Sequence, residues 1–295
     1  MTPNLRGGVI MMGSMAAFTL NDASLKWLAD DLPTFQVVVL RGLLASALIA
    51  GLAHATGALA KPIPAAERGK VALRVGAEVA AFLPFVLALT HMPLANITAI
   101  LQALPLTITA AGALLLGERV GARRWAAIAV GLLGVLLIVR PGTEGWNGWA
   151  AVACLTVVII TVRDLVTRRL SAEVPSLKVA LFTAIGVTVL GAVLSLREPW
   201  QPVAPDQWGV VGLAGVFIIG GYLFSVMAMR VGEVAVVTPF RYTAMLWGLA
   251  LGWLVFGEWP RPLSLVGAGL VVAAGLYTLW RETRPAPMPR AVAPR

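Results

Sequence analysis

Long apolar runs separated by short polar loops dominate this sequence. The runs are about 18 to 25 residues long, which at about 1.5 Å per residue lets a helix cross a hydrocarbon core of about 30 Å. We expect membrane spans at residues 7–29, 33–57, 69–90, 94–117, 121–140, 147–169, 175–196, 207–230, 234–256 and 262–281. The pattern predicts an all-α integral membrane protein with ten transmembrane helices.

Polar and proline landmarks of the first half recur in the second half in the same order. The matches, at shifts of 142, 142 and 140 residues, are Thr19–Asp22 with Thr161–Asp164, Leu32–Phe35 with Val174–Leu177, and Gly117–Glu118 with Gly257–Glu258. Each half would contain five spans, and an odd number of crossings leaves the second copy upside down relative to the first. We therefore predict two inverted five-helix repeats around a central cavity, an architecture typical of secondary transporters.

Composition agrees with a membrane protein. The chain is 59% hydrophobic and 13% charged, against about 25% charged residues in soluble domains. The net charge of +9 raises the question of a nucleic-acid partner, but most basic residues fall in alternate loops on one side of the predicted membrane. This asymmetry predicts that both termini are cytoplasmic, and no nucleic-acid partner is expected. We divide the chain into repeats at 1–142 and 143–282 and a disordered basic cytoplasmic tail at 283–295.

Six ionisable residues fall inside predicted spans, where a charge is costly unless it faces a partner or a watery cavity. They are Asp22, Arg41, Glu78, Arg163, Asp164 and Arg241. Their depths suggest an outer pair, Asp22 with Arg41, and an inner cluster of the other four. We hypothesise that the two groups serve in gating or coupling. The alternative is static neutralisation within helices, by Asp22 with Lys26 and Asp164 with Arg168.

Other polar and aromatic residues lie at mid-membrane depth and are candidates for lining a substrate cavity. They are Asn96, Gln102, Tyr222, Tyr242 and Trp247, with His91 near the outer mouth. A mixed lining of this kind suits a small zwitterionic or amphipathic metabolite. Packing is the competing interpretation for each aromatic residue, and an ordinary interfacial loop position is the competing one for His91.

Two further features are expected to be architectural. The fifth and tenth spans contain several glycines and almost no polar groups in their middles, which favours close helix packing or a lipid-facing support. Gly117-Glu118 and Gly257-Glu258 end two matching spans. Glycine suits a helix C-terminus and a carboxylate suits the N-terminus of the next helix, so we interpret both pairs as tight reversals.

An enzymatic function is not supported by the motifs present. The sequence has no His-Glu-x-x-His motif, no phosphate-binding loop and no Cys/His nucleophile arrangement, and its two histidines, His54 and His91, lie far apart. We expect no cofactor and no metal site. A channel or a lipid scramblase remains an alternative to a carrier.

Pro105, followed by Leu114–Val120 and a Gly/Ala-rich span, resembles the EamA-type repeat of the drug/metabolite transporter superfamily. The second copy ends in Leu254–Glu258, but has Met245 in place of Pro105 and Trp259 in place of Arg119. The resemblance implies a multi-pass carrier of small molecules in the bacterial inner membrane.

Within that superfamily the chain is most similar to the amino-acid exporter branch. Alternative substrates are cationic drugs, nucleosides and sugars. The resemblance leaves open whether the protein is a monomer or a homodimer in the membrane lipid.

Overall fold

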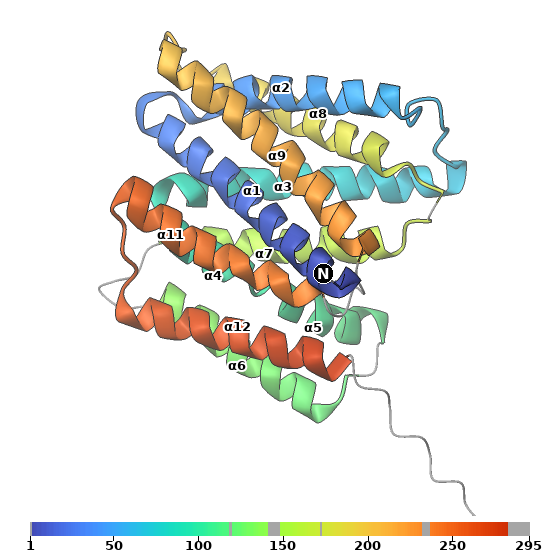
Figure 1. Ribbon diagram of the computed structural model, residues 1–295, viewed down its shortest axis with the longest axis vertical. Helices are drawn as coiled ribbons and strands as arrows, with labels where there is room; N and C mark the ends of the chain where they lie inside the picture. The colour runs from blue at the N-terminus through green and yellow to red at the C-terminus, as the bar shows by residue number, and fades with distance from the viewer. Residues whose placement is uncertain (1, 118–119, 141–147, 172, 232–236, 283–295) are drawn as a thin grey trace, which may run out of the picture.

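The computed structural model describes residues 2–117, 120–140, 148–171, 173–231 and 237–282. These residues form helices joined by short connections, and no strand occurs among them (Figure 1). The helices are α1 Pro3–Asp31, α2 Thr34–Ala55, η1 Ala65–Glu67, α3 Arg68–His91, α4 Leu94–Leu101, α5 Leu104–Leu116, α6 Ala122–Val139, α7 Gly148–Arg168, α8 Ser176–Ser195, α9 Pro205–Val231, η2 Thr238–Thr243, α11 Ala244–Phe256 and α12 Pro262–Glu282. The all-α prediction is confirmed for this part of the chain, and the predicted tail at 283–295 lies outside the described residues.

Seven helical segments of the described chain are long and apolar enough to cross a membrane. They are Thr34–Ala55, Ala65–His91, Leu94–Leu115, Ala122–Val139, Gly148–Thr167, Ser176–Ser195 and Pro205–Ser225. Helix α1 has the length, but Asn21, Asp22 and Lys26 make it more polar. The second-half helices α11 and α12 offer shorter apolar stretches, of 13 residues in α11 and Pro262–Thr278 in α12. The count of ten crossings therefore stays a prediction.

Local sequence explains where several helices begin and end. Helix α1 starts at Pro3, and the Thr2 hydroxyl accepts a hydrogen bond from the amide of Leu5, a standard N-cap. Helices α5 and α11 end at Gly117 and Gly257, whose φ angles of 68° and 64° are left-handed. Glycine adopts this conformation without a steric penalty, so both predicted glycine C-caps are present.

The main helix pairs each join one half of the chain to the other (Figure 1). Helix α1 packs along α9, α3 along α7, α2 along α8, and α6 along α12. The pair α6 and α12, which are the fifth and tenth predicted spans, lies at one edge of the stack. A Cβ at Gly134 would lie 2.5 Å from the backbone oxygen of Gly267, so the two backbones touch where both residues are glycine.

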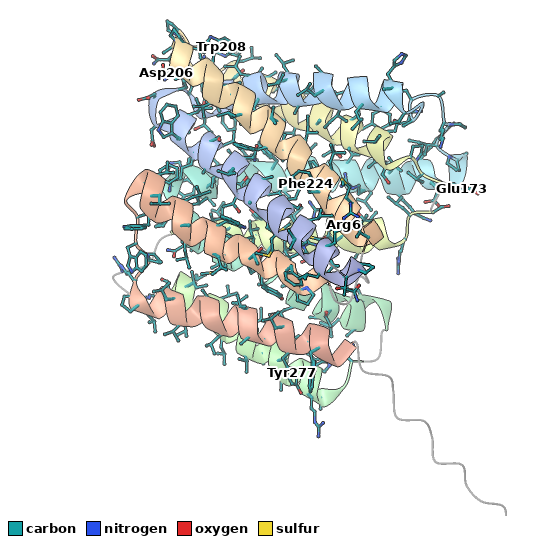
Figure 2. All side chains as sticks on the ribbon, in the orientation of Figure 1. Arg6, Glu173, Asp206, Trp208, Phe224 and Tyr277 are labelled. Carbon is teal, nitrogen blue, oxygen red and sulfur yellow. The ribbon has the colours of Figure 1, made fainter. Side chains whose placement is uncertain are left out.

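The helix bundle has two ends, which we name by residues found there. The Lys26 end contains the α1–α2, α3–α4 and α8–α9 connections, and the Arg74 end contains the α2–α3 and α7–α8 connections. Figure 2 places Asp206 and Trp208 at the Lys26 end, where α9 begins, and Glu173 at the opposite end.

Candidate functional site

A cavity of about 270 Å³ lies between the helices at mid-length. Its walls come mainly from α1, α2, α3, α8 and α9. The polar lining residues are Asn21, Asp22, Arg41, Glu78, Thr183 and Tyr222. The apolar part of the wall includes the aromatic rings of Phe18, Phe82 and Phe85. The site is thus a mostly apolar chamber with a few charged groups, which is the usual composition of a small-molecule site.

Helical periodicity explains how α1 and α3 bring these side chains together. Glu78, Ala81, Phe82 and Phe85 of α3 all line the cavity, and their spacing of i, i+3, i+4 and i+7 places them on one face of a helix. Phe18, Asn21 and Asp22 show the i, i+3 and i+4 part of this spacing on α1. Helix α9 approaches α1 closely because Gly221 has no side chain: a Cβ there would lie 2.7 Å from the Phe18 ring.

An asparagine bridges the two charged groups at the α1–α2 side of the cavity. Arg41 donates from Nη1 to Asn21 Oδ1 at 2.9 Å, and Asn21 donates from Nδ2 to Asp22 Oδ1 at 2.9 Å. Arg41 is 7% exposed, and its Nε has no hydrogen-bond partner in the described chain. Asp22 and Arg41 therefore share one site, but an amide stands between them in place of the predicted direct pair.

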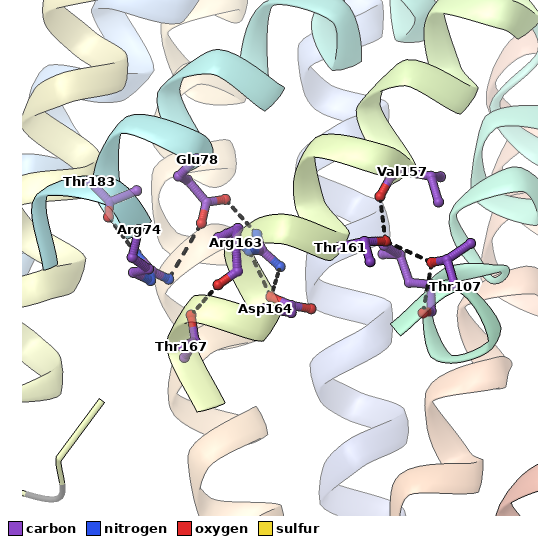
Figure 3. A network of polar contacts seen from close by, with 10 residues as sticks. Arg74, Glu78, Thr107, Val157, Thr161, Arg163, Asp164, Thr167 and Thr183 are labelled. Atoms are coloured by element: carbon purple, nitrogen blue, oxygen red, sulfur yellow. Dashed lines mark hydrogen bonds and ion pairs between the residues drawn. The ribbon is translucent and has the colours of Figure 1, made fainter. Parts of the chain in front are cut away.

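A second set of charges joins α3, α7 and α8 (Figure 3). Arg163 Nη1 lies 2.7 Å from Glu78 Oε1, and Arg163 Nη2 lies 2.7 Å from Asp164 Oδ1. Arg74 donates to Thr183 Oγ1 at 2.6 Å and lies 3.4 Å from Glu78 Oε2. That last contact is an ion pair without hydrogen-bond alignment, since Glu78 Oε2 has no hydrogen-bond partner. Two arginines and two carboxylates thus neutralise one another.

The structure departs from the predicted charge groups in two ways. Arg241 is exposed and forms no ion pair with a described residue, although it lies close enough to Asp164 and Arg163 to interact with their charges. Arg74, which was not assigned to the inner cluster, contacts Glu78. Lys26 does not pair with Asp22 four residues earlier. Instead its Nζ lies 2.6 Å from Glu258 Oε1 and donates to the Met92 carbonyl at 2.7 Å. Static pairing within α1 is therefore absent. The Arg168 side chain lies outside what the structure describes.

Glu258 also differs from its predicted role. Its Oε2 accepts the amide hydrogen of Leu94 at 3.0 Å, so the carboxylate caps α4 and not the following helix α12. The reason is tertiary, because α11 packs beside α4 and brings the end of one to the start of the other. The matching residue Glu118 lies outside the described residues.

Of the six residues predicted to line a cavity, Tyr222 alone contributes to the wall of this one. Tyr242 is buried against α12, where a Cβ at Gly275 would overlap its hydroxyl. Gln102 donates to the Arg241 carbonyl at 3.1 Å. His91 stacks on Trp149 with ring centroids 4.1 Å apart, at the surface. Asn96 is half-buried on α4 and Trp247 exposed on α11, away from the lining. These residues were predicted to line the cavity from their depth along a span. The direction in which each side chain points keeps it out of the cavity wall.

Several site residues were missed from the sequence, namely Arg74 beside Glu78 and the lining residues Asn21, Phe82 and Phe85, although signals for some of them existed. Arg74 and Glu78 are four apart on one helix, a spacing that predicts contact. The stripe Glu78, Phe82 and Phe85 shows the helical period of one face. Asn21 adjoins Asp22, but nothing local indicates that its amide turns toward α2.

The described residues contain no group of three or more His, Cys, Asp or Glu side chains arranged to hold a metal ion. The charged groups of the cavity pair with amides, hydroxyls and one another. Such an arrangement can bind and release a polar solute.

Comparison with known proteins gives the class. The chain is similar to the pseudopaline exporter CntI of Pseudomonas aeruginosa, at 26% identity over 92% of this chain and 95% of that protein. It is 22% identical to the S-adenosylmethionine uptake transporter of Rickettsia prowazekii over 92% of this chain and 91% of the relative. It is 28% identical to a riboflavin transporter of Rhizobium johnstonii, over 68% of this chain and 66% of that protein. A solved crystal structure shares the fold, with a TM-score of 0.65 over 95% of this chain and 99% of that one at 22% identity.

These relatives and the helical, apolar fold define a multi-pass membrane transporter of small molecules, and not an enzyme. The family match is more specific. Residues 5–140 and 147–280 each match the EamA-like transporter family, and the chain belongs to that family. Each matched segment lies within one of the two predicted halves, so the resemblance to the EamA-type repeat is confirmed. The division at residue 142 itself stays a prediction.

Proposed function

We propose that this protein is a secondary transporter that exports amino acids across the bacterial inner membrane by alternating access. One observation carries the substrate class: a buried arginine and an aspartate face one small cavity without pairing directly to each other. Opposite charges held apart in an apolar chamber complement a molecule that itself carries both charges. A bare ion would leave one of the two groups uncompensated, and a neutral sugar would leave both.

The helix pairing supports the inverted repeat. Under the shift of about 140 residues, α1 corresponds to α7 and α3 to α9. The pair α1 with α9 therefore corresponds to the pair α7 with α3, and both pairs are formed. The pairs α2 with α8 and α6 with α12 each correspond to themselves. This is the pattern expected of two halves related by a twofold axis in the membrane plane.

The contact between α4 and α11 supports alternating access. Helix α4 packs against α11 at the Lys26 end. With both termini cytoplasmic, the Lys26 end faces outward. The arrangement then corresponds to a carrier closed to the outside, and the opposite state requires α4 and α11 to separate.

A cationic drug is the second candidate substrate. Asp22 and Glu78 supply negative charge, and the rings of Phe18, Phe82 and Phe85 supply apolar and cation–π surface. Glu78 is already neutralised by Arg163 at 2.7 Å, and Arg41 would repel a cation. The amino-acid proposal is favoured for these reasons.

A counterflow panel tests the substrate class. Purified protein in liposomes preloaded with unlabelled amino acids, nucleosides, sugars or a cationic drug is offered the same labelled compound outside. We expect saturable exchange of amino acids. Exchange of another class without any amino acid contradicts the proposal, and unsaturable flux indicates a channel or scramblase.

Direction is tested separately, because relatives are named both for export and for uptake. Cells producing the protein are loaded with a dipeptide that peptidases hydrolyse, and amino acid appearing in the medium is measured. Faster release than from cells without the protein supports export. Faster uptake of external amino acid with no faster release contradicts it.

A further inference from the structure

We infer that Arg41 and Asp22 form a two-point site, in which Arg41 binds the carboxylate and Asp22 the ammonium of an α-amino acid with an apolar or aromatic side chain. The inference rests on the proposed function and specifies how its substrate is recognised.

The Arg41 guanidinium makes no direct contact with a carboxylate among the described residues, because the Asn21 amide stands between it and Asp22. The Arg41 side chain lines the cavity at 7% exposure, and its one hydrogen bond goes to a neutral amide oxygen. Its Nε is buried with no hydrogen-bond partner in the described chain. A buried charge without an opposite partner is costly, and guanidinium pairs best with a carboxylate through two parallel hydrogen bonds. A carboxylate entering the cavity would supply the missing partner.

Asp22 is left with unused acceptor capacity on the same wall. Its Oδ1 accepts from Asn21, and no other described residue donates to its carboxylate. Lys26, one turn along α1, is held by Glu258 and the Met92 carbonyl. The nearby arginines Arg74 and Arg163 are held by Glu78, Asp164 and Thr183. An ammonium group from a ligand would give this carboxylate a cationic partner in direct contact.

The bridge through Asn21 sets the spacing of the two sites. A single side-chain amide reaches Arg41 with its oxygen and Asp22 with its nitrogen, each at 2.9 Å. The acceptor and donor of that amide are separated by one carbon atom. In an α-amino acid, a carboxylate oxygen and the ammonium nitrogen are separated by two carbons, a similar span. Such a ligand can therefore bridge the same two residues beside or in place of Asn21.

The remaining wall of the cavity indicates what kind of side chain the ligand has. Phe18, Phe82, Phe85 and Tyr222 face it, and the Arg41 guanidinium lies 5.6 Å from the centre of the Phe82 ring. Its volume of about 270 Å³ lies near the lower limit of roughly 300 Å³ for small-molecule sites. A single amino acid fits this description better than a long or strongly polar solute.

Calorimetric titration of the detergent-solubilised wild-type protein tests the site with three ligands. L-Phenylalanine has both charges, phenylalaninamide lacks the carboxylate, and 3-phenylpropionate lacks the ammonium. We expect either loss to weaken binding about tenfold to a hundredfold, since each removes a charged hydrogen-bond partner. Equal affinity for phenylalanine and either analogue overturns the inference, whatever the variants do.

Variants assign the two roles. Arg41→Gln should weaken phenylalanine binding by the same factor while leaving phenylalaninamide unchanged. Asp22→Asn should weaken phenylalanine and leave 3-phenylpropionate unchanged. The matched controls are Arg197→Gln and Asp206→Asn, both exposed and away from the cavity, and these should bind all three ligands as the wild type does. A variant that weakens every ligand equally overturns the assignment.

The two proposals fail in different ways. If amino acids exchange in liposomes but Arg41→Gln and Asp22→Asn keep the wild-type preference among the three ligands, the recognition site is wrong and the transport function stands. If another solute class exchanges and no amino acid does, the transport proposal itself is wrong.

Discussion

Lys26 and Glu258, 232 residues apart in the chain, form an ion pair with Nζ and Oε1 2.6 Å apart. The contact joins α1 to the residue that follows the C-cap of α11. Glu258 also accepts the Leu94 amide at the start of α4, and Lys26 also donates to the Met92 carbonyl. Their side chains are 8% and 26% exposed. One carboxylate and one ammonium thus tie three helices together at the Lys26 end.

Removing this carboxylate should loosen that end of the bundle. We expect Glu258→Ala to lower the stability by about 1.5–3 kcal/mol, the usual value of hydrogen bonds to a charged group. Glu258→Gln should cost less, because its amide oxygen can still accept from Leu94. Thermal unfolding in detergent measures both, with the exposed Glu173→Gln as the control. Equal melting temperatures for all three variants would show that the pair contributes nothing.

The same substitution should also change access to the cavity. If the pair holds α4 against α11, a cysteine in place of Ala45, which lines the cavity, should react faster with an impermeant thiol reagent added from the Lys26 side in Glu258→Ala. Cys154 is first replaced by alanine to provide a thiol-free background. Unchanged labelling from that side would contradict a role in closure.

Arg163 should be required for the stability of the protein because it compensates the charges of two carboxylates. Arg163→Gln leaves Glu78 and Asp164 without their shared partner, and uncompensated charge in a partly buried site destabilises. We expect the double variant Arg163→Gln with Glu78→Gln to be more stable than Arg163→Gln alone. The coupling energy of the double-mutant cycle should be about 0.5–3 kcal/mol. Additive losses would mean that the ion pair is not energetically coupled.

Close packing of α6 on α12 gives a prediction with an internal control. Gly134→Ala places a methyl group 2.5 Å from the Gly267 carbonyl oxygen, so the helices must separate, at a cost of about 1–3 kcal/mol. Gly269→Ala on α12 meets nothing within 4 Å and should be neutral or stabilising. Melting temperatures compare the two, and equal effects would refute close contact at Gly134.

The proposed inverted topology can be tested at two corresponding exposed positions, Asp31 and Glu173, which differ by the repeat shift of 142. Single cysteines at these positions, in the Cys154→Ala background, should label from opposite sides of the membrane. Treating intact cells and inside-out vesicles with an impermeant thiol reagent shows from which side each cysteine is labelled. Labelling from one side at both positions would exclude inverted repeats.

The linear order of residues determined the elements and part of the site. Apolar runs of membrane length indicated the helical class, and glycines at corresponding places indicated the ends of α5 and α11. Ionisable groups at membrane depth drew attention to Asp22, Arg41 and Glu78, all of which reach the cavity. These conclusions follow from length, periodicity and the cost of burying charge, which are properties of one segment at a time.

Only the tertiary structure decided which charges meet. Lys26 sits four residues from Asp22, yet it binds Glu258 because α1 and α11 pack together at that end. Arg74 contacts Glu78, and Tyr242 turns toward α12 and away from the cavity. Depth in a span is readable along the chain, but the direction of a side chain depends on how each helix rotates against its neighbours. That rotation is fixed by contacts between segments far apart in the chain, such as Lys26 with Glu258 and Glu78 with Arg163.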